Sequence, residues 1–147
     1  MYCTVDDIKM TIPERELINL TQDNPAQNQS VDTVLLEQII TLSGEVIDGY
    51  LRSRYTLPLA STPDLIKSLA IDIVVYRLYS RRPTKINDTV KDNYKEALNQ
   101  LLQVQKGLLM LALDVNNIQV ELRTNLIRTN KRREDKKFTD NYLSGMP

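Results

Sequence analysis

Residues Ile66–Tyr79 have the sequence IKSLAIDIVVYRLY, and their apolar side chains cover nearly the whole circumference of a helix. A helix that is apolar on all sides belongs in the interior of a domain. It is preceded by Thr62-Pro63, an N-cap residue followed by a proline suited to the first helical position. Arg81 and Arg82 are expected in its last turn, where cations complement the helix dipole, and it ends before Pro83, because proline cannot continue a helix. We therefore predict that a helix of about residues 62–82 forms the centre of the core.

Two amphipathic patterns flank this helix. From Val31 onward, apolar residues recur at helical spacing for about twenty residues, with Ser30 or Asp32 as the N-cap. A second helix is predicted for 89–106, closed by Gly107 in the position that glycine favours after a helix. Two short capped helices at the start of the chain complete the set. The predicted fold class is mostly α, a compact helical bundle around the central apolar helix.

The chain changes character after this bundle, which we assign to residues 1–113. Residues 118–123, IQVELR, alternate with period two, and Asn116-Asn117 suits a turn, so the pattern is compatible with a C-terminal β-hairpin. The apolar run 108–113 is either a strand or a helical turn packed on the bundle. We assign residues 114–147 to a hairpin and an extended arm that makes assembly contacts and orders on binding.

The residue types restrict the chemistry that this chain can perform. It has no histidine, a single cysteine and four unclustered glycines, which argues against the usual general base, zinc ligands and phosphate-binding loops. Carboxylate pairs remain at Asp6/Asp7, Glu14/Glu16 and Glu134/Asp135. The first two pairs fall at predicted helix starts, where acids complement the helix dipole. We expect no catalysis, no metal and no cofactor; a hydrolase using these pairs with Mg²⁺ is the enzymatic alternative.

Compartment and solubility follow from simple features. Cys3 is alone, so no internal disulfide can form and a reducing compartment is expected. No apolar run approaches the length needed to span a membrane, and the start of the chain lacks a signal-peptide pattern. We therefore expect a soluble protein without a membrane partner.

Asp72 is the most informative polar residue, because it interrupts the most apolar helix. A buried carboxylate needs a partner. Arg52 and Arg54 precede the central helix, and their planar guanidinium groups suit a carboxylate. Tyr76, one turn further on, is a third candidate. We predict a structural ion pair between Asp72 and one of the two arginines rather than a functional site.

Charge is unevenly distributed, although the net charge is zero. Up to Asp64 there are ten acids and four bases, whereas 123–137 holds seven bases and two acids. Contacts with DNA or with a protein partner are expected at Arg123, Arg128, Lys131, Arg132, Arg133, Lys136 and Lys137, and at the bulky apolar residues Phe138, Tyr142 and Leu143. Two interpretations of the basic run stay open: a solvated tail, or salt-sensitive contact with phosphates or an acidic neighbour. A nucleic-acid-binding accessory protein that uses this tail is the alternative function.

Several strings together resemble a known family. These are 48–59 (DGYLRSRYTLPL), 76–82 (YRLYSRR), 94–98 (YKEAL) followed by Lys106-Gly107, the opening 2–8 and the closing 138–145. They resemble the small morphogenesis proteins of Mu-like phages and prophages, which are similar to the head-to-tail connector, or neck adaptor, proteins of tailed phages.

The resemblance implies a virion protein whose copies assemble as a ring between portal and tail. Its expected partners are further copies of itself, the portal protein and a tail-completion or tail-terminator protein, with non-specific contact to DNA in the channel. The expected locations are the virion and, during assembly, the host cytoplasm. Opposite charge at the two ends of the chain suits the head-to-tail contacts of a ring.

Overall fold

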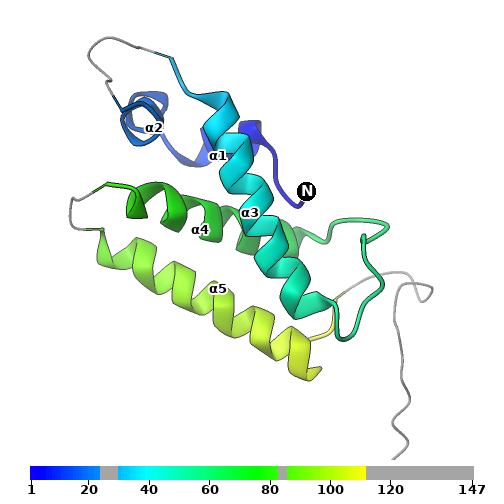
Figure 1. Ribbon diagram of the computed structural model, residues 1–147. Helices are drawn as coiled ribbons and strands as arrows, with labels where there is room; N and C mark the ends of the chain where they lie inside the picture. Colours follow the sequence, from blue (N-terminus) through cyan, green and yellow to red (C-terminus); the bar gives the residue numbers. More distant parts are fainter. Residues whose placement is uncertain (24–29, 83–85, 112–147) are drawn as a thin grey trace, which may run out of the picture.

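The computed structural model describes residues 1–23, 30–82 and 86–111. Five helices make up most of these residues, and no strand occurs among them (Figure 1). The helices are α1 (Val5–Thr11), α2 (Glu14–Thr21), α3 (Thr33–Leu51), α4 (Asp64–Ser80) and α5 (Asp88–Lys106). The prediction of a mostly helical fold is confirmed for this part of the chain. The predicted hairpin and arm, residues 114–147, lie outside the described residues.

Helix α4 is the centre of the bundle, as its apolar sequence predicts. It packs against all four other helices, with α5 alongside it and α3 crossing both (Figure 1). Ile66, Ile73, Val74 and Leu78 are completely shielded from solvent. Burial of each large side chain contributes roughly 1.5–3 kcal/mol by apolar transfer. A single apolar cluster runs from Tyr2 to Leu111, so the described residues share one core.

The helix ends follow the sequence signals in part. Asp32 caps α3, since its Oδ1 accepts a hydrogen bond of 3.0 Å from the Leu35 N–H. Gly107 ends α5 with a φ of 77°, the left-handed conformation that glycine adopts without a steric cost. The predicted cap at Thr62 is wrong, because Pro63 itself occupies the N-cap of α4 and provides no side-chain hydrogen bond. Pro13 does the same at α2.

Hydrogen bonds and an ion pair attach the N-terminal residues to the bundle. Thr4 and Asp7 form a reciprocal capping box at the start of α1. The Asp7 carboxylate also pairs with the Lys67 ammonium at 2.8 Å, which joins α1 to α4. These contacts hold the pKa of Asp7 at about 2, with the Lys67 hydrogen bond as the main cause. The Tyr2 hydroxyl donates to the Asp48 carboxylate of α3.

The glycines of α3 have different surroundings. A β-carbon at Gly44 would lie 3.7 Å from the ring of Tyr2, so the close neighbour there is the N-terminal tail rather than another helix. Gly49 faces open space. Neither glycine therefore marks a close approach between two helices.

Candidate assembly surfaces

The crossover from α3 to α4 is attached to the chain that leaves α5. Tyr55 in this crossover is buried, and its hydroxyl accepts a hydrogen bond of 3.1 Å from the Leu111 N–H. A buried donor left unpaired costs about 1–3 kcal/mol. Tyr55 therefore fixes the point from which the C-terminal region departs. Residues 108–111 form neither of the two structures considered from the sequence, a strand or a helical turn: 108 and 109 form a bend, and 110 and 111 have no regular secondary structure.

Arg54 lies against the end of α5. A β-carbon at Gly107 would overlap its guanidinium group, so glycine is needed there for space as well as for its φ. The carbonyl groups at a helix C-terminus carry partial negative charge, which favours a cation at this position. Arg54 thus helps to join the crossover to α5. Its guanidinium group lies against the end of that helix instead of pairing with a carboxylate.

We call the surface at this end of the bundle the basic corner: Arg52, Arg54, Lys106, Leu108 and Met110. Arg52 and Lys106 are exposed, and no ion pair in the described part of the chain involves either of them. Leu108 and Met110 are 77% and 67% exposed. Large apolar side chains with this exposure next to unpaired cations are typical of a contact surface rather than of a solvated turn.

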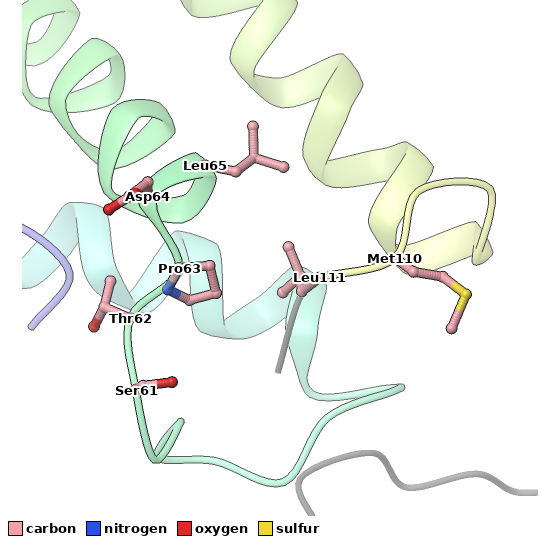
Figure 2. A pocket seen from close by; sticks show the side chains of 7 residues that line it. All are labelled: Ser61, Thr62, Pro63, Asp64, Leu65, Met110 and Leu111. Carbon is pink, nitrogen blue, oxygen red and sulfur yellow. The ribbon is translucent and has the colours of Figure 1, made fainter. Parts of the chain in front are cut away.

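A hollow of about 510 Å³ opens beside the basic corner. Figure 2 shows it between the crossover, the first turn of α4 and the chain after α5, with Pro63, Leu65 and Leu111 around it. Asp64 is the one titratable residue among its lining residues. A single exposed carboxylate beside apolar groups provides no pair for acid–base chemistry.

Asp72 does not form the predicted ion pair. It is half-buried on α4, and none of the ion pairs or hydrogen bonds in the described residues reaches its carboxylate. Burial raises the pKa of Asp72, which means that its charged form is disfavoured where it lies. The sequence prediction failed because Arg52 remains in solvent and Arg54 turns to the end of α5.

Asp72 belongs to a row of partly accessible side chains that we call the open stripe of α4. Its members share one helical face and are Leu65, Ser68, Asp72, Val75, Tyr76 and Tyr79. Leu65, Val75 and Tyr79 pack on the core along one side while keeping part of their surface accessible. Tyr76 stacks on Tyr94 of α5 with ring centroids 4.0 Å apart. The most apolar helix thus keeps one face on which every side chain retains some solvent exposure, although Tyr76 contacts α5 and Tyr79 contacts α2.

Side chains at the C-terminal end of α4 form hydrogen bonds with helix α2 and the residue after it. The guanidinium of Arg81 donates to the Leu20 carbonyl at 2.9 Å, and Arg82 donates to the Gln22 carbonyl. The Tyr79 hydroxyl donates to Glu16 at 2.5 Å. Burial and this carboxylate raise the pKa of Tyr79 to about 12. From the sequence, both arginines are expected in the last turn of α4. No local pattern indicates that they bind the C-terminus of another helix.

A metal-binding cluster and an activated thiol are two features that catalysis can use. No group of three or more acidic, cysteine or histidine side chains in 1–23, 30–82 and 86–111 is placed to hold a metal ion. Cys3 is buried, and this burial raises the pKa of its thiol to about 11, opposite to the shift that makes a nucleophile. In the same ranges, none of the helices combines the length and the apolar character that crossing a membrane requires.

The remaining predicted contact residues cannot be placed. All of them lie outside the described residues: Arg123, Arg128, Lys131, Arg132, Arg133, Lys136 and Lys137, and the apolar Phe138, Tyr142 and Leu143. Their predicted roles therefore remain predictions.

Comparison with known proteins supplies the family. The family model described as bacteriophage Mu, Gp36 matches residues 2–127. The chain belongs to this family of Mu-like phage proteins. The match ends at residue 127, so it does not extend to 138–145, the closing segment included in the expected resemblance.

Two curated relatives agree with this membership. "Gene product J" of Escherichia phage Mu is 31% identical over 106 residues, which cover 72% of each chain. The Mu-like prophage FluMu protein gp36 of Haemophilus influenzae is 29% identical over 93 residues, or 63% of this chain and 64% of the relative. The shared region is long enough to contain most of the helical bundle.

Proposed function

We propose that this chain is a structural protein of the virion, a head-to-tail connector or neck adaptor subunit. Its copies assemble as a ring between the portal and the tail. The portal protein would bind one side of the ring and a tail-completion or tail-terminator protein the other. The chain would act in host cytoplasm during assembly and stay in the finished virion, with no catalytic step.

Membership of a Mu-like phage family supports a morphogenesis role, and the basic corner carries the proposal further. Hydrogen bonds between distant parts of the chain hold the helices of the bundle together, such as those joining Tyr55 to Leu111 and Arg81 to Leu20. Exposed Leu108 and Met110 lie where the chain leaves this body. A rigid block with an apolar, positively charged exit point is suited to repeated contacts between subunits.

Locating the protein in the particle tests the proposal. Particles carrying a tag after Pro147 would be imaged with a bound antibody fragment, and untagged particles treated in the same way would be the control. We expect label at the junction of head and tail only. Label along the tail tube or at the baseplate, or loss of the protein on particle purification, would contradict a connector role.

A loss-of-function experiment provides a second readout. A phage with a stop codon early in this reading frame should accumulate filled heads and complete tails that fail to join. Supplying the full chain from a plasmid should restore joined particles. Normal joined particles in the absence of the chain would rule out the proposed role.

A further inference from the structure

The open stripe and the basic corner are complementary in polarity and in charge. The stripe is apolar with one carboxylate, Asp72, which has no partner among the described residues. The basic corner is apolar with cations, of which Arg52 is exposed and likewise unpaired in that part of the chain. The two surfaces therefore match in polarity and are opposite in charge.

Asp72 and Arg52 do not pair within one molecule, although Leu65 of the stripe and Met110 of the basic corner line the same hollow. Asp72 sits in the middle of α4, whereas Arg52 caps the far end of α3 and Arg54 is held over Gly107. Arg77 lies five residues after Asp72 on α4 and forms no ion pair with it. A half-buried carboxylate such as that of Asp72 loses hydration without gaining a cation. A second molecule can provide the missing cation.

We propose that the open stripe of one copy binds the basic corner of the next, with Asp72 paired to Arg52 of the neighbouring copy. The two surfaces are different parts of the chain, so the contact is heterologous and repeats from copy to copy. Leu108 and Met110 of the neighbour would cover Val75 and Tyr76 and remove water from around the ion pair. This inference rests on the proposed function, because it specifies the contact between subunits of the ring.

Charge reversal tests the pairing. Asp72→Arg and Arg52→Asp should each weaken self-association, measured by sedimentation velocity from micromolar concentration to about 1 mM, by roughly 30-fold or more. The double variant, D72R with R52D, restores opposite charges across the contact. It should recover most of the affinity of the unaltered chain.

Matched controls use exposed residues that belong to neither surface. Glu37→Arg on α3 and Arg15→Asp on α2 make the same changes in net charge, alone and together. Neither should change association by more than about twofold. Circular dichroism and urea midpoints at low concentration would show that each variant folds. Asp72→Asn, which removes the charge without adding bulk, would replace Asp72→Arg if that variant did not fold.

Several results would overturn the proposal. These are a chain that stays monomeric over the whole range, a single reversal without effect, or a double variant as weak as the single variants. An effect of Asp72→Arg with none from Arg52→Asp would point to basic residues after Leu111 as the occupant instead. The location of the chain in the virion is measured independently, so a failed pairing and a failed connector role can be told apart.

Discussion

The central position of α4 and the accessibility of its open stripe can be tested with two substitutions two residues apart. Ile73 is completely buried, while Val75 belongs to the stripe and is half-buried. Ile73→Ala removes three carbon groups from the core, a transfer loss of about 2.4 kcal/mol at roughly 0.8 kcal/mol each. The cavity left in the core adds to this loss, so we expect a total of about 3–4 kcal/mol.

Val75→Ala should behave differently. It removes two carbon groups, but only about half of the transfer loss applies at a half-exposed position, which leaves roughly 0.8 kcal/mol. Alanine is also the better helix former, by about 0.5 kcal/mol against a β-branched residue. The two effects nearly cancel, and the free energy of unfolding should change by less than about 0.5 kcal/mol.

Urea unfolding followed by circular dichroism is the assay, at a protein concentration low enough to keep the chain monomeric. With a slope of about 2 kcal/mol/M, Ile73→Ala should lower the midpoint by about 1.5–2 M and Val75→Ala by less than about 0.3 M. Val75→Ala should nevertheless weaken self-association. A loss below about 1 kcal/mol for Ile73→Ala, or equal losses for both variants, would refute the assigned positions of the two faces.

Three further predictions concern single contacts. Tyr55→Phe should cost about 1–3 kcal/mol, because it leaves the buried Leu111 N–H without an acceptor, and the amide of Leu111 should exchange faster with solvent. Arg81→Ala should cost about 1.5–3 kcal/mol and speed amide exchange in α2, whereas Arg15→Ala, on the exposed face of that helix, should not. Cys3, with its pKa raised to about 11, should resist iodoacetamide at pH 8 until urea unfolds the chain, and rapid labelling of the folded protein would contradict its burial. Because the thiol of the unfolded chain ionises at a lower pH than the buried thiol, the free energy of unfolding should fall as pH rises from about 9 to 11.

Much of the bundle could be predicted from the sequence because helices are specified by nearby residues. The all-round apolar pattern of 66–79 identified α4 as the centre, and Gly107 and Asp32 identified two helix ends. These signals depend on residues within about four positions of one another, which is the range of helical hydrogen bonds and of side-chain spacing. They are present in the sequence whatever the tertiary fold.

The charged contacts were decided by the tertiary structure alone. Arg81 was expected in the last turn of α4, yet its guanidinium binds a carbonyl 61 residues away. Asp72 was expected to pair with Arg52 or Arg54, yet no described ion pair reaches it. Long side chains can reach many partners, and which one they meet depends on how the helices cross. Local sequence determines that a helix forms and which face is apolar, whereas packing determines which charges meet and which stay available to another molecule.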